Sequence, residues 1–238
     1  MNKAICAVSV APIRAQHSHQ SEMTSQLLYG ESLEIIEVEG SFSKIKMDFD
    51  GYEGWVDSRQ ISKISAEEFE NRRTEIISKP FGIYDVKGGK NLLSMGSELN
   101  SETEKCTETI HNESIAETAK HFLNVPYLWS GRSFFGIDCS GFVQLVYKVH
   151  GISLPREARE QSEVGQVLDF IEESEAGDLA FFENSDGIIS HVGIMLEDQK
   201  IIHAYGKVRI DSLDSAGIYN ADLKKHTHKL RFVKSLRV

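Results

Sequence analysis

The spacing of apolar residues along this 238-residue chain changes near residue 110. Before that point, apolar and polar residues alternate in short runs that are interrupted by Gly30, Gly40 and Gly51. Such runs are typical of β-strands joined by tight turns. We therefore predict a small β-barrel over residues 1–64. Its expected strands are Ile5–Val10, Ser32–Glu39, Ser43–Met47 and Gly54–Val56, with a long polar loop, Arg14–Gln26, between the first two.

Residues 65–110 are predicted to extend this N-terminal half. The charged stretch Ala66–Ile77 is expected to form a short helix, and residues 80–99 have the pattern of a hairpin around Gly88-Gly89. Residues 100–110 are mostly polar, which is typical of an exposed linker. We place the boundary between the two halves of the chain there.

Residues 111–238 are predicted to form an α+β domain with helices packed on an antiparallel sheet. Apolar residues recur at helical spacing in Asn112–Leu123, with Asn112 as the N-cap and Pro126 beyond the end. A second helix is expected over Cys139–His150, because Gly151 is a typical stop signal. The strands expected after it are Asp178–Glu183, His191–Glu197, Lys200–Tyr205, Val208–Ile210 and Leu230–Leu236.

Charge and hydropathy exclude two classes of partner. The formal net charge is −10, whereas nucleic-acid binders carry basic surfaces, so no nucleic-acid partner is expected. The sequence contains no stretch approaching 18 consecutive apolar residues, so no membrane helix is expected.

The cysteines are few and scattered. Cys6, Cys106 and Cys139 fit neither a disulfide framework nor a zinc-binding spacing, which favours a reduced, cytoplasmic protein. The N-terminal apolar run resembles a short signal peptide, and a secreted or periplasmic protein is the alternative. A first β-strand through Cys6 is the favoured interpretation of that run.

Cys139 is the candidate nucleophile, because it is expected at the start of a helix. A thiol there lies near the positive end of the helix dipole and near unpaired backbone N–H groups, so its pKa is expected to fall. The same N–H groups could stabilise an oxyanion. Cys6, in a predicted strand, and Cys106, in the predicted linker, lack this setting.

His191 and His203 are the candidate base and its orienting partner, since a nucleophilic cysteine needs both. They lie on consecutive predicted strands. A two-residue turn would pair His203 with Ile194 and place the two histidines on opposite faces of the sheet. A three-residue turn would pair it with Met195, about 13 Å along the strand from His191. The contact therefore requires a bulge or strong coiling of the strands.

Six segments follow one another in the second half of the chain: Asp138-Cys139-Ser140-Gly141-Phe142, Gly151-Ile152, Leu154-Pro155-Arg156, Ala176-Gly177-Asp178-Leu179, Ser190-His191-Val192-Gly193 and Ile202-His203-Ala204. In these segments the chain resembles NlpC-type papain-like cysteine peptidases of bacterial cell-wall metabolism. The resemblance implies that Cys139 is the nucleophile, His191 the general base and His203 the third member. It also matches Tyr127 to a tyrosine that assists near the catalytic cysteine, although an ordinary packed aromatic residue is an equal alternative.

Two short runs of the N-terminal half are Leu28-Tyr29-Gly30-Glu31 and Gly51-Tyr52-Glu53-Gly54-Trp55-Val56. The resemblance that they carry is to the SH3-like domain of γ-D-glutamyl-L-diamino acid endopeptidases. It implies cleavage of the γ-D-glutamyl–diaminopimelate bond in murein peptides that have a free N-terminal L-alanine, during peptide recycling. The residues implied in binding the substrate ammonium are Asp138, Ser140, Glu31 and Tyr52. Without the resemblance, Glu31 would be interpreted as a solvated surface acid.

Three further expectations complete the interpretation. The resemblance implies a monomer that acts on a small peptide and needs no cofactor and no metal. Ala158 stands where such enzymes often carry a serine that helps to bind the amine, so one contact is missing or replaced. His226 and His228 lie in a polar segment and are interpreted as surface residues. The alternative functions are a secreted hydrolase of intact peptidoglycan and a non-catalytic murein-peptide binding module; the second would be expected to have lost the cysteine or a histidine.

Overall fold

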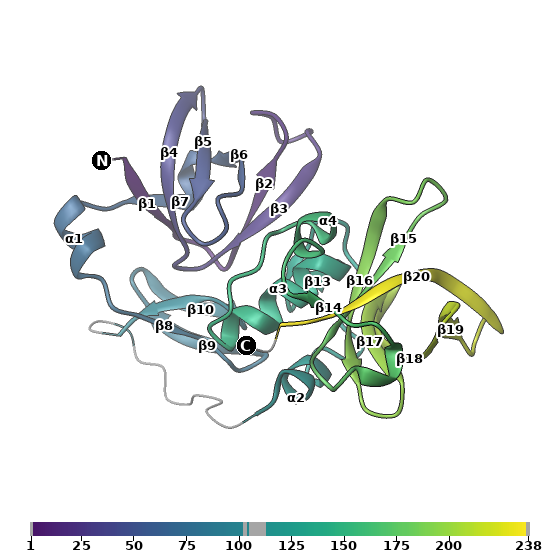
Figure 1. Cartoon of the computed structure of the whole chain (residues 1–238). Helices are drawn as coiled ribbons and strands as arrows, with labels where there is room; N and C mark the ends of the chain where they lie inside the picture. Colours follow the sequence, from purple (N-terminus) through teal and green to yellow (C-terminus); the bar gives the residue numbers. More distant parts are fainter. Residues whose placement is uncertain (1, 102–103, 105–112, 237–238) are drawn as a thin grey trace. The chain divides into compact units, whose positions relative to one another are not determined.

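The computed structural model describes residues 2–101, 104 and 113–236. It divides the chain into two compact units (Figure 1). Unit 1 consists of Met1–His111 and Trp129–Phe135, and unit 2 consists of Asn112–Leu128 and Gly136–Val238. Among the described residues, no helix is both long and apolar enough to cross a membrane.

Unit 1 is built mainly of antiparallel strands. Seven of them form one sheet in the order β3-β2-β6-β5-β4-β1-β7. Two further pairs, β9 with β10 and β8 with β11, form separate two-stranded sheets. The elements are β1 (Lys3–Cys6), β2 (Val10–Arg14), β3 (Met23–Leu28), β4 (Ser32–Glu39), β5 (Phe42–Met47), β6 (Glu53–Asp57), η1 (Ser58–Gln60), β7 (Ile61–Lys63), α1 (Ala66–Asn71), β8 (Thr74–Ile76), β9 (Phe81–Val86), β10 (Gly89–Ser94) and β11 (Glu98–Asn100).

Three sequence predictions for unit 1 need correction. The expected strand Ile5–Val10 is divided between β1 and β2, which pair with different neighbours. The expected polar loop Arg14–Gln26 is shorter, because its last residues belong to β3. The expected helix Ala66–Ile77 ends at Asn71, and Thr74–Ile76 pairs with β11 instead. The predicted hairpin around Gly88-Gly89 is confirmed as β9 and β10.

The segment Trp129–Phe135 belongs to unit 1 although its neighbours in the chain belong to unit 2. Trp129 donates from Nε1 to Glu22 at 3.1 Å, and the backbone N–H of Phe134 donates to Ser94 Oγ at 2.8 Å. This return of the chain was not predicted, because the sequence around it carries no composition shift. The segment Trp129–Phe135 contains β12 (Arg132–Ser133).

Unit 2 is centred on a second antiparallel sheet of seven strands, in the order β14-β20-β15-β16-β17-β18-β19. Strand β20 also pairs with β19, so six of the strands close on themselves. The elements are α2 (Ile115–Lys120), β13 (Gly136–Ile137), α3 (Cys139–Val149), α4 (Ala158–Gln161), β14 (Gln166–Val167), η2 (Ile171–Glu173), β15 (Leu179–Glu183), β16 (Ile189–Leu196), β17 (Lys200–Tyr205), β18 (Lys207–Asp214), β19 (Gly217–Asn220) and β20 (Lys225–Ser235).

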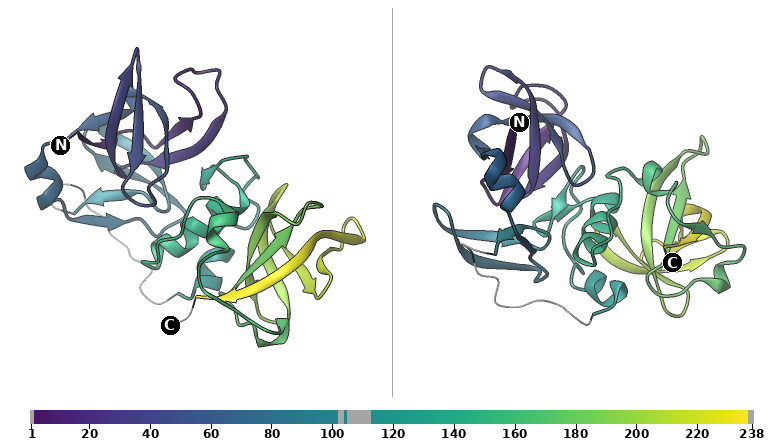
Figure 2. Two further views of the ribbon diagram at one scale, coloured as in Figure 1. Left: turned by 45° about the horizontal axis from the view of Figure 1, so that its top comes forward. Right: turned by 60° about the vertical axis from the view of Figure 1, so that its left-hand side comes forward.

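One face of this sheet carries its own apolar core. That core contains Ala180, Phe182, Met195, Ile201, Leu213, Ile218 and Val233. Helix α3 packs against β16 and β17, as both views of Figure 2 show. Consecutive residues of β16 and β17 are buried. Because side chains alternate between the two faces of a strand, these two strands are covered on both faces.

The helices of unit 2 agree with the predictions unevenly. Helix α3 begins at the predicted residue, and Gly151 follows its end with φ +76°, the left-handed conformation expected of a stop glycine. Helix α2 is shorter than predicted. Its N-cap is Ser114, whose Oγ accepts from the backbone of Glu117 while the Glu117 carboxylate accepts from the backbone of Ser114. The predicted cap, Asn112, lies outside the described residues.

Candidate active site

Cys139 is the first residue of helix α3, and Asp138 caps the helix. Asp138 has extended backbone angles, φ −92° and ψ 179°, and its Oδ1 accepts a hydrogen bond from the backbone N–H of Gly141 at 2.7 Å. This carboxylate satisfies an N–H group that the helix leaves unpaired. Cys139 is buried, with 8% of its surface exposed. The predicted position of a thiol at a helix N-terminus is therefore confirmed.

The environment of this thiol differs from the sequence expectation. Burial raises the pKa of Cys139 to about 12, and the charge of Asp138 adds to the rise. The backbone N–H groups of Val192 and Ser140 and the charge of Arg156 act in the opposite direction. The predicted fall in pKa is wrong for the resting protein, because loss of hydration outweighs these favourable contributions. Cys139 is a neutral thiol at rest and needs a base to become a nucleophile.

Cys6 is not in a comparable setting. Cys6 lies in β1, in the core of unit 1, and burial raises its pKa to about 12 without a histidine partner. Cys106 lies outside the described residues.

The thiol of Cys139 has Val192 beside it, and Val192 directly follows His191 in β16. The cysteine therefore lies against the strand that carries the candidate base.

His191 and His203 face each other across β16 and β17. Nε2 of His191 lies 2.8 Å from Nδ1 of His203, and both residues are buried. The pairing of Ile194 with Ile202 sets the register, and continuing it by one step brings His203 opposite Gly193. His203 is therefore offset by two residues from His191 and on the same face of the sheet.

The loop between β16 and β17 explains why both predicted registers are wrong. Pairing ends at Leu196 and Lys200, so three residues form the connection. Two of them, Asp198 and Gln199, have positive φ angles of 58° and 51°. This turn begins earlier in the chain than either predicted turn, which moves His203 to a different partner. The face shared by the two histidines follows from the odd number of residues in the turn.

The predicted contact required a bulge or strong coiling of the strands, and β16 has a bulge on the side that pairs with β15. In the pairing with β15, Phe182 lies opposite His191 and Glu183 lies opposite Ile189, which leaves Ser190 without a counterpart. A bulge of this kind bends a strand and redirects the side chains next to it. It stands directly before His191.

Gly193 provides the space in which the two histidines meet. A Cβ atom on this residue would lie 2.9 Å from Cβ of His203 and 2.7 Å from Cδ1 of Ile201. Both distances are below ordinary contact, so even alanine would push His203 away. The glycine is required here for close approach and not for an unusual backbone angle.

Both imidazoles are neutral near pH 7. Burial lowers the pKa of His191 well below its usual value, and the neighbouring His203 and His228 lower it further. Burial also lowers the pKa of His203, although Asp211 opposes this change. A neutral His191 is able to accept a proton from Cys139.

His228, predicted to lie at the surface, belongs to this cluster instead. Its ring stacks on that of His191, with the centroids 4.1 Å apart and the planes at 24°. It also contacts His203 and Tyr205 edge-on, at 5.6 Å and 4.9 Å. Burial lowers the pKa of His228 to about 4. Its neighbour His226 is exposed as predicted and bonds to Asp214 at 2.9 Å.

The three clustered histidines offer ring nitrogens that lie within 4.8 Å of one another. Imidazole nitrogens of this kind could hold zinc. Two ligands of one tetrahedral zinc lie about 3.3 Å apart at Zn–N distances of about 2.0–2.1 Å. The 2.8 Å hydrogen bond between His191 and His203 would therefore have to open for a metal to enter.

A carboxylate that the sequence argument did not select lies behind His203. Oδ2 of Asp211 is 3.0 Å from Nε2 of His203. Arg209 donates to both carboxylate oxygens of Asp211, at 2.7 Å and 2.8 Å. The sequence carried no signal for Asp211, because the alternating apolar residues Val208 and Ile210 lie on the opposite face of β18, and only the structure shows that Asp211 is buried.

Tyr127 lies close to Cys139, as the resemblance implied. It is half-buried, and its pKa is raised to about 12 by burial and then by the negative charges of a Cys139 thiolate and Asp138. Its backbone N–H donates to the carbonyl of Gly206 at 3.0 Å. The phenol is protonated at neutral pH and can act as a hydrogen-bond donor.

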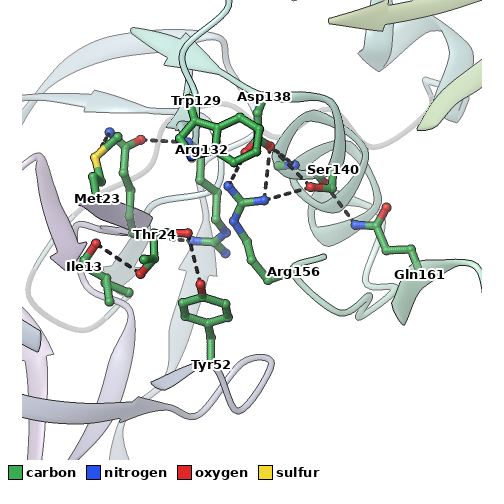
Figure 3. Close-up of polar contacts among 12 residues, drawn as sticks. Ile13, Met23, Thr24, Tyr52, Trp129, Arg132, Asp138, Ser140, Arg156 and Gln161 are labelled. Atoms are coloured by element: carbon green, nitrogen blue, oxygen red, sulfur yellow. Dashed lines mark hydrogen bonds and ion pairs between the residues drawn. The ribbon is translucent and has the colours of Figure 1, made fainter. Parts of the chain in front are cut away.

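Asp138 and Ser140 are held by a buried arginine (Figure 3). Arg156 donates to both oxygens of Asp138, at 2.7 Å and 3.1 Å, and to Oγ of Ser140 at 2.9 Å. Gln161 donates from Nε2 to the carbonyl of Ser140 at 3.0 Å. Ala158 begins helix α4 and is buried, and no side chain caps that helix. These contacts fix the first turn of α3 around Cys139.

Glu31 is buried in unit 1 and is not the solvated acid that its residue type suggests. Only 1% of its surface is exposed. Its two oxygens accept from Arg132 at 2.7 Å each, and Oε2 also accepts from the backbone of Leu28 at 2.8 Å. The interpretation as a surface residue is therefore wrong. Tyr52 is partly buried, and its hydroxyl donates to the carbonyl of Thr24 at 3.1 Å (Figure 3).

Both units match known protein families. Residues 124–227 match the family described as "NlpC/P60 family", and residues 13–61 match "Bacterial dipeptidyl-peptidase Sh3 domain". Among solved structures, the fold is similar to the crystal structure of an NlpC/P60 family protein from Bacillus cereus ATCC 10987, with a TM-score of 0.81 and 21% identity. The match covers 98% of this chain and 99% of that one. The likeness supports the NlpC-type and SH3-like parts of the predicted fold.

Two curated relatives carry the same name, gamma-D-glutamyl-L-lysine dipeptidyl-peptidase. The protein from Bacillus cereus (strain ATCC 10987 / NRS 248) is 26% identical over 231 residues, which cover 79% of this chain and 68% of the relative. The protein from Bacillus subtilis (strain 168) is 29% identical over 214 residues, which cover 76% of this chain and 71% of the relative.

Proposed function

Because this chain carries an NlpC/P60 domain and a bacterial SH3 domain, we propose that it is a cysteine peptidase of papain-like type. Its proposed reaction is hydrolysis of the γ-D-glutamyl–L-diamino acid bond in murein peptides that have a free N-terminal L-alanine. The observation that supports it most directly is the position of Cys139, at the start of α3 and beside Val192, next to the hydrogen-bonded pair His191 and His203.

The first half of the proposed reaction forms a thioester. The sulfur of Cys139 attacks the γ-carbonyl carbon of D-glutamate while His191 takes the thiol proton. The carbonyl oxygen becomes an oxyanion, which the N–H groups at the start of α3 and the hydroxyl of Tyr127 stabilise. The C–N bond then breaks, and His191 returns the proton to the departing amine of the diamino acid.

The second half releases the product and restores the enzyme. Water attacks the thioester carbon and gives a proton to His191. The C–S bond breaks, and the proton passes to the sulfur of Cys139. The thiol and the imidazole are both neutral again, which is the resting state that their burial favours.

Substrate selection is proposed to depend on the free ammonium of L-alanine. Carboxylates bind such a group by charge-assisted hydrogen bonds. Asp138 and Ser140 are adjacent to Cys139 in the chain, and we assign them to this role together with Glu31 and Tyr52. Glu31 already binds Arg132, so its part requires an ion pair that is shared with the substrate. Small peptides of this kind are consistent with a role in peptide recycling in the cytoplasm.

The experiment that tests the proposal is mass spectrometry of the products from a panel of peptides. L-Ala-γ-D-Glu-L-Lys and the same tripeptide with meso-diaminopimelate should each be compared with their N-acetylated forms and with intact sacculi. We expect cleavage after D-glutamate in the free peptides only, and no cleavage by Cys139→Ala. Turnover by Cys139→Ala would exclude the mechanism.

The same panel separates the alternative functions. Preferential release from sacculi would indicate a hydrolase of intact peptidoglycan. Binding without turnover of any peptide would indicate a murein-peptide binding module. Undiminished cleavage of the acetylated peptide would exclude the ammonium-binding roles of Asp138, Ser140, Glu31 and Tyr52 while leaving the chemistry at Cys139 in place.

A further inference from the structure

Asp211 stands at the end of a chain of hydrogen bonds that begins at the candidate base. His191 bonds to His203 at 2.8 Å, and His203 bonds to Asp211 at 3.0 Å. His203 and Asp211 are both buried. The pairing of His203 with Arg209 across β17 and β18 makes Asp211 the diagonal neighbour of His203 on the same face. The contact therefore follows from the register of two central strands.

Asp211 can only accept hydrogen bonds here. Burial by itself would raise its pKa, but the hydrogen bonds from His203 and Arg209 outweigh that effect, so the net shift is downward. An ionised carboxylate has no proton to donate. Arg209 reinforces this state, because a guanidinium only donates and it contacts both carboxylate oxygens. Nε2 of His203 must therefore carry the proton in its bond to Asp211.

The protonation of the remaining nitrogens follows in sequence. A neutral imidazole carries one proton, so a proton on Nε2 of His203 leaves Nδ1 as an acceptor. Nε2 of His191, which faces that Nδ1 atom, must then be the donor. The one nitrogen of His191 left with a free lone pair is Nδ1. Only in this tautomer can His191 take the thiol proton while it remains bonded to His203.

We propose that Asp211, held by Arg209, is a positioning residue that sets the tautomers of His203 and His191 and so keeps Nδ1 of His191 available as the base. Its catalytic consequence rests on the proposed peptidase function, whereas the tautomers themselves do not. When Cys139 transfers its proton, the positive charge that develops on the two imidazoles is compensated by Asp211. The transferred proton never has to reach Asp211.

The direct test uses the unmodified protein. Nitrogen-15 NMR of histidine side chains distinguishes a protonated ring nitrogen from one with a lone pair. We expect a proton on Nε2 in both His191 and His203 near pH 7, with Nδ1 of both unprotonated. Protonation of Nδ1 in both rings would overturn the proposal. This measurement needs no substrate, so it stands or fails independently of the proposed function.

Substitution supplies the second test. Asp211→Leu has nearly the same shape but no acceptor, so His203 gains nothing from a proton on Nε2 and both tautomers should invert. We expect kcat to fall by about 10²- to 10⁴-fold with little change in KM, as for a base in the wrong tautomer. Asp211→Asn keeps one acceptor but no charge, so its kcat should lie between that of Asp211→Leu and that of the wild type.

Asp222→Asn is the matched control. Asp222 is exposed and also binds Arg209, at 2.9 Å, but it does not contact His203. This variant should keep the wild-type tautomers and activity. If Asp211→Leu does not fold, the NMR spectra of Asp211→Asn and of the wild type show which tautomers His191 and His203 adopt and so test the proposal. A folded Asp211→Leu protein with wild-type kcat and tautomers would show that the carboxylate only connects β17 to β18, and would overturn the proposal.

Discussion

Nε2 of His191 lies 2.8 Å from Nδ1 of His203, although strand pairing brings His203 opposite Gly193. The two-residue offset is about 6.6 Å along a strand, which two imidazole side chains can span only by leaning toward each other. The missing side chain of Gly193 leaves room for that lean. The bulge before His191 adds to it by bending β16.

Gly193→Ala should therefore separate the histidines. The new Cβ atom would meet Cβ of His203 at 2.9 Å and Cδ1 of Ile201 at 2.7 Å. We expect a loss of about 1–3 kcal/mol in the free energy of unfolding, as for other overpacked cores. We also expect a fall in kcat/KM. Urea unfolding and steady-state kinetics measure the two effects.

A second substitution separates these effects. Ile201→Val removes the Cδ1 atom but keeps the carbon that corresponds to Cγ1, which would lie 2.9 Å from the new Cβ atom, so the double variant Gly193→Ala/Ile201→Val should recover only part of the stability. The contact with His203 remains, and kcat/KM should stay low. If the double variant regains wild-type activity, crowding at Ile201 alone explains the loss and the role given to Gly193 in positioning His203 is wrong.

The fold was predictable where local signals and tertiary packing agree. Helix α3 begins and ends close to the predicted residues, because Asp138 caps it and Gly151 stops it. The single strand expected over Ile5–Val10 was wrong, because its two parts pair with different strands and no local signal records that choice. The insertion Trp129–Phe135 was missed for the same reason.

The candidate site was predictable only in part. The segments around Cys139, His191 and His203 identified these side chains, and the structure brings the two histidines together. His228 and Asp211 were missed, because their contacts depend on the registers of β20 and β18. The pKa of Cys139 was predicted in the wrong direction, since burial cannot be judged from a motif.

The ion pair of Glu31 with Arg132 predicts a large effect in unit 1. Both side chains are almost fully buried, at 1% and 0% exposure. Removing one partner takes this ion pair away from the other, which stays buried, and we expect a cost of up to about 3–5 kcal/mol. Glu31→Gln and Arg132→Met should each lower the stability of this unit, and thermal unfolding measures the loss. Single variants as stable as the wild type would contradict the interpretation.

The double variant Glu31→Gln/Arg132→Met distinguishes structure from substrate binding. With both members of the ion pair gone, neither is left buried without the other, and the loss should be smaller than the sum of the single losses. If Glu31 also binds the substrate ammonium, the double variant should have a higher KM for the free tripeptide than the wild type, even where its stability is recovered. Recovery of both stability and KM would leave Glu31 with a structural role only.

The stacked ring of His228 predicts a graded loss of activity. An aromatic pair contributes about 0.5–1.5 kcal/mol beyond burial. His228→Ala removes the plane that rests on His191 at 4.1 Å, and we expect kcat to fall by roughly 2- to 10-fold. His228→Phe keeps a ring and should retain more activity than the alanine variant. Equal activity in both variants would show that stacking does not hold His191 in place.

The buried histidines predict a loss of stability in acid. The folded pKa of His228 is about 4, and that of His191 is well below its usual value, so both lie below the unfolded value of about 6.5. Between the folded and unfolded values, the unfolded chain binds more protons than the folded chain. The free energy of unfolding therefore rises with pH across this window and falls as pH drops from about 6.5 toward 4.

Urea unfolding at several pH values between 7 and 4 measures this slope. His228→Phe removes one of the titrating groups, so its stability should depend less steeply on pH than that of the wild type. A wild-type stability that does not change between pH 6.5 and 4 would contradict the neutral, buried cluster. The same neutral state makes His191 a competent base below pH 6.5. We therefore expect kcat/KM to be retained below pH 6.5 as long as the protein remains folded.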